Sequence, residues 1–238
     1  MENENKDDDQ KIIVSKEHIR FAVLATDIAF FTIHDKKLFV RVIPVDRPPH
    51  FIDREGLPGG LILPKETAEE SAMRILLEKT KIIPGQVYIE QLYTFSSVDR
   101  DPRGRVVSVA YLALVPWETL SESEREGQDG SHWIALGAAR DLAYDHDEVL
   151  AVALARLRMR VTYTTLLSKL MPKEFTLTDL EETYETVLGR MIDKRNFRKK
   201  IEKLGILEEL PHKREGGRHR PARLYRFATT KVKEIEIL

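Results

Sequence analysis

The sequence predicts an α/β domain followed by a smaller domain of two short helices and a two-stranded hairpin. Strands interleaved with a few helices occupy the chain up to about residue 144, and two amphipathic helices that end at glycines follow. The second part also carries a concentration of basic residues. At 238 residues, of which 42% are hydrophobic, the chain is long enough to build two cores of ordinary size.

The first predicted elements are the two strands of a hairpin. Residues 19–43 alternate between apolar and polar positions or run apolar, and a polar turn at 34–37 divides them. Prolines and glycines predict a loop over 45–60. A helix is predicted from Thr67 to a point before Pro84. One stripe of that helix is formed by Ala68, Ala72, Leu76 and Thr80.

A second pair of strands and another helix follow. The strands are predicted over 87–97 and 105–115, with the charged connector VDRDPRG between them. Trp133 and Leu136 are expected to return to the core. The stretch DHDEVLAVALARLRMR predicts a helix with Asp145 as its N-cap. We place the domain junction at the start of this helix, which gives a tail over 1–15, a first domain over 16–144 and a second domain over 145–230.

Two helices joined by a short turn are predicted in the second domain. Thr178 and Glu181 have capping-box spacing in the first helix, which Gly189 ends. Its inward stripe is Leu180, Tyr184, Val187 and Leu188. Asp193 caps the second helix, and Gly205 ends it. That helix turns Phe197, Ile201 and Leu204 inward and leaves Arg195, Asn196, Arg198 and Lys199 to solvent.

Charge is distributed unevenly along the chain. From Arg190 to Arg226 there are thirteen basic and five acidic residues, a net charge of +8, which leaves −9 for the rest of a chain whose total is −1. Lys and Arg that neutralise phosphates release condensed counterions and thereby gain affinity for a polyanion. A solvated charged face is the alternative explanation. The asymmetry favours a polyanionic partner for the second domain.

A helix, a turn, a basic helix and a hairpin with a basic tip make the element order of a winged helix-turn-helix. The strand-like segments ILEEL and RLYRFA flank the tip, PHKREGGRHRPA. A helix packed on one face can enter the major groove, where Arg pairs with guanine and Asn with adenine, and glycines let arginines approach the minor groove. A protein-interaction module is the alternative, but the charge is concentrated at the helix and the tip. The predicted contacts to double-stranded DNA are Lys194, Arg195, Asn196, Arg198, Lys199, Lys213, Arg214, Arg218 and Arg220.

Composition excludes several classes of protein. The chain has no cysteine, so it holds neither disulfides nor thiolate metal sites, and His212 and His219 lack partners at metal-ligand spacing. No apolar run approaches the roughly 18 residues of a membrane span. The start, MENENKDDDQ, is acidic and polar, unlike a signal peptide. We expect a disordered tail on a cytoplasmic protein.

The segment GGLILPKETAEESAMRILLEKTKI, residues 59–82, has the layout of a metal-dependent hydrolase motif without most of its carboxylates. Gly60, Glu66 and Arg74 follow the pattern G-x5-E-x7-R, which resembles the Nudix box. In that family, glutamates one, four and five positions after the arginine converge on one helix face and hold divalent cations. Those positions are Ile75, Glu78 and Lys79 here, and Lys81 replaces the last glycine of the box. Lys79 repels a cation and is expected to pair with Glu78 or a ligand phosphate, so we expect neither a bound metal nor hydrolysis.

Over residues 18–227 the chain resembles the Nudix-related transcriptional regulators of the NrtR family. The resemblance rests on LPGG before the box, RDPRGRVVSVAYLAL at 100–114, FTLTDLEETYETVLGR at 175–190, and DKRNFRKKIEKLGIL followed by GGRHRPARLYRF. It implies a Nudix-like α/β/α sandwich with a mixed sheet, then a winged helix. It also implies a homodimer that binds a palindromic operator and represses genes of NAD metabolism. Its effector would be ADP-ribose or a related nucleotide, and no cofactor would be required.

The resemblance implies an effector cleft lined by Gly59, Gly60, Arg74, Glu78, Arg100, Asp101 and Arg103. Arginine suits a pyrophosphate because its planar fork matches two oxygens at once. For Arg100 and Arg103 the alternative is an exposed turn stabilised by Asp99 and Asp101. Two other functions stay open: an active Nudix pyrophosphatase with a DNA-binding appendage, and a regulator of the same build that responds to a sugar or sugar phosphate.

Overall fold

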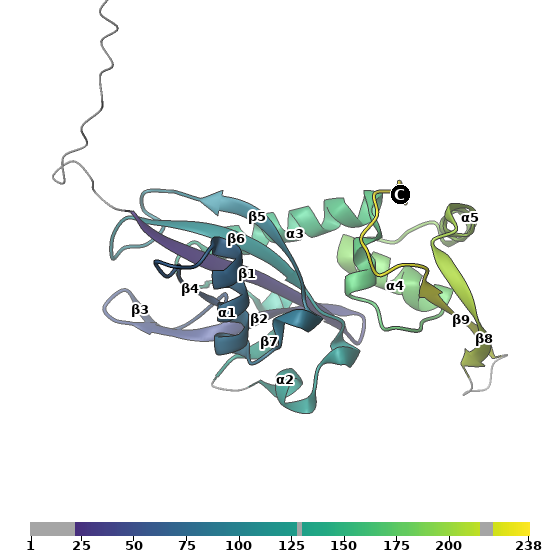
Figure 1. Ribbon diagram of the computed structural model, residues 1–238, viewed down its shortest axis with the longest axis horizontal. Helices are drawn as coiled ribbons and strands as arrows, with labels where there is room; N and C mark the ends of the chain where they lie inside the picture. The colour runs from purple at the N-terminus through teal and green to yellow at the C-terminus, as the bar shows by residue number, and fades with distance from the viewer. Residues whose placement is uncertain (1–21, 128–129, 215–220) are drawn as a thin grey trace, which may run out of the picture.

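The computed structural model describes residues 22–127, 130–214 and 221–238, and it consists of two domains joined by one long helix (Figure 1). The first domain is built on strands β1 (Val23–His34), β2 (Lys37–Arg47), β3 (Phe51–Gly56), β4 (Gly59–Leu61), β5 (Tyr88–Phe95), β6 (Val106–Leu114) and β7 (His132–Ala135). They form one sheet with the order β3-β2-β1-β6-β5, in which β4 pairs with β1 and β7 with β2. β1 and β6 are parallel and the other pairs antiparallel, so the predicted mixed sheet is confirmed.

Helices cover both faces of this sheet, which gives the predicted α/β/α sandwich. Successive side chains of a strand point to opposite faces. Ile28 and Phe30 of β1 therefore pack in one cluster with α1 (Ala68–Thr80), whereas Ala29 and Phe31 belong to the cluster of α3 (His146–Tyr163). All four side chains are fully buried. The first domain also contains α2 (Glu122–Glu126) and the 3-10 turns Pro84–Gln86, Trp117–Thr119 and Leu136–Ala138. A further 3-10 turn, Thr165–Lys169, follows α3.

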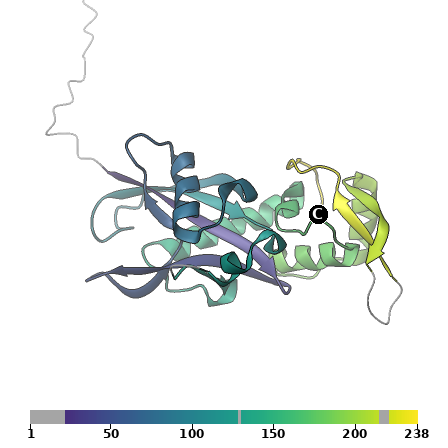
Figure 2. The same ribbon diagram turned by 60° about the horizontal axis from the view of Figure 1, so that its bottom comes forward.

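The helix α3 belongs to both halves of the molecule, and Figure 2 shows it running from the sheet toward the second domain. Toward the sheet, Arg160 pairs with Glu90 of β5 at 3.4 Å. On the same C-terminal half of α3, Leu157 and Val161 share a hydrophobic cluster with Leu166 of the second domain. A continuous core therefore joins the sheet, α3 and the second domain, and the domain junction near residue 145 remains a prediction.

The second domain has the predicted winged-helix order: α4 (Leu177–Leu188), α5 (Lys194–Leu204), β8 (Leu207–Arg214) and β9 (Ala222–Phe227). The rings of Tyr184 on α4 and Phe197 on α5 pack with centroids 5.0 Å apart, and both side chains are buried. The Asp193 carboxylate accepts from two amides at the start of α5. Gly189 and Gly205 end the two helices in the left-handed conformation, as the sequence predicts.

The segment predicted as a loop over 45–60 contains two strands, so that prediction was wrong. β3 pairs with β2, and β4 pairs with β1 through Gly59 and Gly60. Its prolines fall at 48, 49 and 58, in the connections that precede β3 and β4, where the missing amide costs no ladder hydrogen bond. The turn residues were thus recognised correctly, but they separate short strands and do not fill one long loop.

The capping prediction for α4 was wrong, and the prediction for α3 was right in position but not in its side-chain hydrogen bond. The capping box of α4 is formed by Thr176 and Asp179, while Thr178 lies inside the helix. Glu181 does not cap because its carboxylate binds Arg198 of α5. Asp145 precedes α3 as expected, yet its side chain makes no capping hydrogen bond, because Arg100 binds it. In each case a tertiary ion pair took the carboxylate that a local motif would have used.

Some expectations lie beyond the part of the chain that the structure describes. The predicted tail over 1–15 is one, and the centre of the basic tip over 215–220 is another. The flanking residues 211–214, which were assigned to the tip, form the end of β8. None of the described helices is both long and apolar enough to cross a membrane.

The end of α1 generates a stability prediction. Lys81 occupies the box position where the family has glycine, and its backbone is left-handed with φ 60°. Because this conformation is unfavourable for residues with a Cβ, Lys81→Gly should raise the free energy of unfolding by about 0.5 to 1 kcal/mol. Chemical denaturation measures this change. The matched control, Lys79→Gly in the last turn of the same helix, should instead lower stability by about 1 kcal/mol. Equal losses in both variants would contradict this account of Lys81.

Candidate functional site

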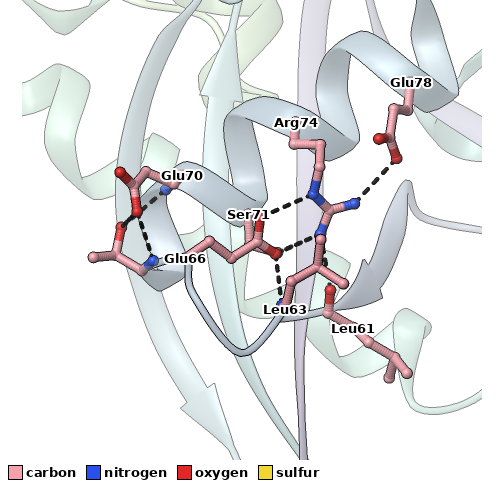
Figure 3. Close-up of polar contacts among 8 residues, drawn as sticks. Leu61, Leu63, Glu66, Glu70, Ser71, Arg74 and Glu78 are labelled. Atoms are coloured by element: carbon pink, nitrogen blue, oxygen red, sulfur yellow. Dashed lines mark hydrogen bonds and ion pairs between the residues drawn. The ribbon is translucent and has the colours of Figure 1, made fainter.

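The Nudix-like segment holds Arg74 in a set of contacts that joins α1 to β4 (Figure 3). Glu66 accepts from Nε at 2.9 Å and from Nη2 at 2.5 Å, Glu78 accepts from Nη1 at 3.0 Å, and the Leu61 carbonyl accepts from Nη2 at 2.9 Å. The hydrogen bond from Arg74 lowers the pKa of Glu66 to about 2, and Glu66 in turn raises the pKa of Arg74. Arg74 therefore holds β4 and α1 together. Glu78 pairs with Arg74, whereas the sequence predicted that Lys79 would pair with Glu78 or with a ligand phosphate.

The donor set on α1 does not fit a divalent cation. Ile75 is 1% exposed and packs in the core beneath the helix, and Lys79 is exposed. Of the three box positions that would carry metal carboxylates, only Glu78 supplies one, and Arg74 binds it. Hard divalent cations need several oxygen ligands. The residues present therefore offer no basis for metal-activated water at this helix.

A buried ion-pair network lies on the other side of the glycines. The Arg100 guanidinium donates to Asp145 at 2.6 and 2.8 Å and to Asp27 at 2.8 Å, and its side chain is only 3% exposed. His146 faces the same Asp27 carboxylate at 3.4 Å, while its Nδ1 accepts the Leu57 amide. Burial alone would raise the pKa of Asp27, but His146 and Arg100 together hold it well below its usual range. The network joins β1, the β5–β6 connector and the start of α3.

Asp27, Asp145 and His146 lie close enough together to suggest a metal site. Arg100, however, already donates hydrogen bonds to both carboxylates. Its guanidinium supplies the positive charge that a cation would bring. The alternative that Arg100 lies in an exposed turn was wrong, because its side chain is 3% exposed, and its role in an effector cleft stays a prediction. Its role in the structure is to bind the start of α3 to the sheet.

Arg103, Tyr144 and Phe51 form a partly exposed rim next to this network. Asp101 is buried and binds the Arg103 guanidinium at 2.7 and 2.9 Å, and that guanidinium lies 5.1 Å from the centre of the Tyr144 ring. The rings of Tyr144 and Phe51 pack at 4.4 Å. Tyr144 has φ 60°, a conformation that bulky residues rarely adopt and that concentrates at functional sites. The rim presents a cation and two aromatic rings, the groups that suit phosphate and purine.

The two glycines of LPGG have steric reasons to be glycine. A Cβ on Gly59 would lie 2.3 Å from a carboxylate oxygen of Asp27, and a Cβ on Gly60 would lie 3.3 Å from Ile75. The first glycine thus lets β4 approach the buried network, and the second lets α1 pack against β4. Neither observation tests whether a ligand touches these glycines, so their predicted role in an effector cleft stays a prediction.

Some of the predicted DNA-binding side chains are exposed, and others bind acidic residues of the second domain. Lys194, Arg195, Lys199 and Lys213 are exposed. The Asn196 amide donates to Asp193, and Arg214 pairs with Asp179 of α4 at 2.9 Å. Arg198 is exposed, as expected, and its guanidinium also binds the buried carboxylate of Glu181. Arg218 and Arg220 lie outside the described residues.

Sequence reasoning missed Asp27, His146 and Tyr144. Asp27 is a lone carboxylate inside an apolar strand. A buried charge is costly unless it is paired, so this position alone could have predicted an ion pair. His146 and Tyr144 flank Asp145, which was read only as a helix cap. Their roles depend on the connector that carries Arg100, which is far away in sequence, and no local pattern reveals that contact.

Comparison with known families and proteins matches both domains. A NUDIX domain model matches residues 24–156, and the model described as NrtR DNA-binding winged helix domain matches residues 167–227. The ADPR responsive transcriptional repressor NtrR of Acinetobacter baylyi is 36% identical over 210 residues, which are 87% of this chain and 82% of that protein. An ADP-ribose pyrophosphatase of Methanocaldococcus jannaschii is 32% identical over 96 residues, which are 40% of this chain and 53% of that protein.

Solved structures agree with these matches. Shewanella oneidensis NrtR complexed with a 27mer DNA is 32% identical, with a TM-score of 0.72 over 86% of this chain and 93% of that one. The NUDIX domain of the same protein complexed with ADP ribose has a TM-score of 0.51 at 32% identity, over 60% of this chain and 93% of that one. The similarity thus covers both domains together.

The buried network generates a second prediction. Arg100→Met removes the guanidinium from Asp145 and leaves Asp27 with His146 alone, so it should lower the free energy of unfolding by about 3 to 5 kcal/mol at neutral pH. In the wild type, the depressed pKa of Asp27 contributes stability above its unfolded pKa, and this contribution is lost as pH falls through the folded pKa. The deficit of the variant should therefore be greatest above about pH 5 and shrink below pH 4.

Denaturant titration at several pH values measures this deficit. The exposed Arg47, whose guanidinium bonds only the neighbouring Asp46 carbonyl in the described structure, provides the control Arg47→Met, with an expected change within about 0.5 kcal/mol. A pH-independent deficit for Arg100→Met, or one no larger than that of the control, would show that the network does not hold the domain together.

Proposed function

The chain belongs to the NrtR family of Nudix-related regulators, and we propose that it is an ADP-ribose-responsive transcriptional repressor whose Nudix domain binds the nucleotide without hydrolysing it. The observation that carries this proposal is the joint match of both domains to a repressor 36% identical over 87% of the chain. The donor set of α1 agrees with it, because box positions 75 and 79 hold isoleucine and lysine.

The winged helix supplies the DNA-binding surface. On α5, Arg195 and Lys199 are four residues apart and therefore share a face, with Lys194 beside them. All three are exposed, as is Lys213 near the end of β8. Arg195 suits a guanine edge in the major groove, and the lysines suit phosphates. As a homodimer the protein would present two such helices to the half-sites of a palindromic operator.

For the effector we propose a surface that includes the rim of Arg103, Tyr144 and Phe51. The Arg103 side chain is 44% exposed, and Asp101 holds it in one orientation through Nε and Nη2, which leaves the Nη1–Nη2 edge to face a pyrophosphate. The aromatic pair suits stacking on a purine. Arg74 contributes less than the sequence suggests, because binding a phosphate there would break its pairing with Glu66 and Glu78. A regulator that answers to a sugar or sugar phosphate would not require this combination of cation and rings.

Two connections can carry the effect of the ligand to the winged helix. One is α3, whose start is bound by Arg100 next to the rim. The other is the β1–β2 turn, where Lys36 pairs with Glu182 of α4 at 2.9 Å and the Lys36 carbonyl accepts from the Thr186 hydroxyl. A cleft of about 460 Å³ separates the two domains beside this turn. Movement of α3 relative to the sheet would alter the Lys36 contact.

The proposed function predicts that ADP-ribose binds the protein, weakens its binding to DNA and is not hydrolysed. The DNA probe is a duplex that the full-length protein selects from a randomised pool, and its dissociation constant is measured by fluorescence anisotropy with and without ADP-ribose. A ligand coupled by about 1 to 3 kcal/mol should weaken binding roughly 5- to 150-fold. Chromatography of the same samples with Mg²⁺ or Mn²⁺ present should show no AMP.

Each part of that experiment can fail separately. Turnover on the order of 1 per second, abolished by Glu78→Gln, would establish the pyrophosphatase alternative. An unchanged DNA affinity with ADP-ribose, together with weakening by a pentose or sugar phosphate, would assign the chain to the sugar-responsive alternative.

The contact between the domains generates a further prediction. Lys36→Ala removes the ion pair with Glu182, so it should leave DNA affinity without ligand within about threefold of wild type, since exposed pairs contribute little stability. The factor by which ADP-ribose weakens DNA binding should fall, because one connection between the domains is lost. Lys37→Ala is the matched control, as Lys37 is exposed at the next position. The same response to ADP-ribose in both variants would exclude the β1–β2 turn as a coupling element.

A further inference from the structure

The carboxylate of Glu181 is a charged group with no exposed surface inside the winged helix. It lies on α4 among apolar residues, and its side chain is 0% exposed. Its two oxygens accept from Nε and Nη2 of Arg198 on α5, the second at 3.0 Å. The Arg198 side chain is 46% exposed, so the pair extends from the domain interior to the surface of the DNA-binding helix.

A buried ion pair is a weak source of stability, because desolvation of the charges offsets their attraction. The ion pair also restricts the relative orientation of α4 and α5. The apolar contacts between α4 and α5, chiefly Tyr184 against Phe197, tolerate sliding and rotation since they lack preferred hydrogen-bond geometry. A planar guanidinium that shares two hydrogen bonds with one carboxylate allows one relative orientation. The Glu181–Arg198 pair therefore fixes the rotation of α5 about its axis.

The same helix α4 holds the neighbouring parts of the DNA-binding surface. Asp179, two residues before Glu181, pairs with Arg214 of β8 at 2.9 Å. Glu185, one turn later, accepts the Ile192 amide in the turn that precedes α5. Acidic side chains of α4 thus bind the wing, the turn and the DNA-binding helix. Three attachments to one rigid helix define where the basic groups of α5 and β8 stand relative to each other.

We propose that Glu181 and Arg198 are positioning residues for DNA recognition, and that Arg198 orients α5 instead of contacting DNA. This inference rests on the proposed function of the second domain as a DNA-binding module. With Arg198 bound to Glu181, the face formed by Arg195 and Lys199 is presented to the groove. Base readout depends on this orientation because a bidentate contact to a base edge requires a fixed approach, whereas contacts to phosphates tolerate rotation. Loss of the pair should therefore reduce discrimination between sequences more than overall attraction to DNA.

The test compares full-length variants on two duplexes of equal length, one selected by the wild-type protein from a randomised pool and one of unrelated sequence. Dissociation constants are measured over a range of salt concentrations. Lys199→Ala serves as the reference for a lost phosphate contact and should lower the salt slope by about one on both duplexes. Arg198→Ala should leave the slope on the unrelated duplex unchanged and reduce the preference for the selected duplex at least tenfold.

Two further variants separate positioning from charge. Arg198→Lys keeps the positive charge and loses the fork, so it should reduce sequence preference like Arg198→Ala while circular dichroism and thermal unfolding report a folded domain. The double variant Glu181→Gln, Arg198→Ala should discriminate no worse than Arg198→Ala alone, since both changes break one interaction.

Three results would overturn the proposal. A salt slope for Arg198→Ala that falls like that of Lys199→Ala would make Arg198 a phosphate contact. Wild-type sequence preference in Arg198→Lys would mean that charge alone suffices. A greater loss of sequence preference in the double variant than in Arg198→Ala alone would mean that Glu181 and Arg198 act independently. Failure of the wild-type protein to select any duplex would instead refute the DNA-binding function on which the proposal rests.

Discussion

The fold depends on one buried guanidinium. Arg100 comes from the connector between β5 and β6, and it binds Asp27 in the central strand and Asp145 at the start of α3. Gly59 allows this arrangement, because any side chain there would collide with Asp27. Since α3 continues into the core of the winged helix, the same contact fixes the base of the second domain. The proposed effector rim lies next to this contact, since Tyr144 directly precedes Asp145 and Arg103 follows Arg100 by three residues, so a ligand there would act close to the start of α3.

The Nudix box retains its architecture without most of the carboxylates that would hold a metal. Glu66 and Arg74 still join β4 to α1, and Gly60 still admits the close packing of the helix. The metal positions have been replaced by a core residue, Ile75, and an exposed lysine, Lys79. A domain that holds a nucleotide without consuming it can respond reversibly to the concentration of that nucleotide, which is what a regulator requires. In the proposed function, the basic helix and hairpin of the second domain convert this response into a change of DNA affinity.

Periodic and capping signals predicted much of this structure from sequence. The strands β1, β2, β5 and β6, the helix of the box, the ends of α4 and α5 at glycines and the Asp193 cap follow local rules, and the structure confirms them. Local rules failed where a carboxylate has a distant partner. The partners of Asp145, Glu181 and Arg198 went unrecognised because nothing in their neighbourhood indicates Arg100 or the facing helix. Arg103 was predicted to bind the ligand, but Phe51 and Tyr144 were missed for the same reason, since they meet only in the folded chain.

Reciprocity between ligand and DNA tests the central claim most directly. If ADP-ribose binds the DNA-competent and DNA-incompetent arrangements unequally, then DNA must weaken ADP-ribose binding by the same factor by which ADP-ribose weakens DNA binding. Calorimetric titration of ADP-ribose into the full-length protein, with and without a saturating duplex that the protein has selected, measures this factor. The account predicts two affinities that differ by about 5- to 150-fold. Equal affinities in the presence and absence of the duplex would contradict it, because the two domains would then bind their ligands independently.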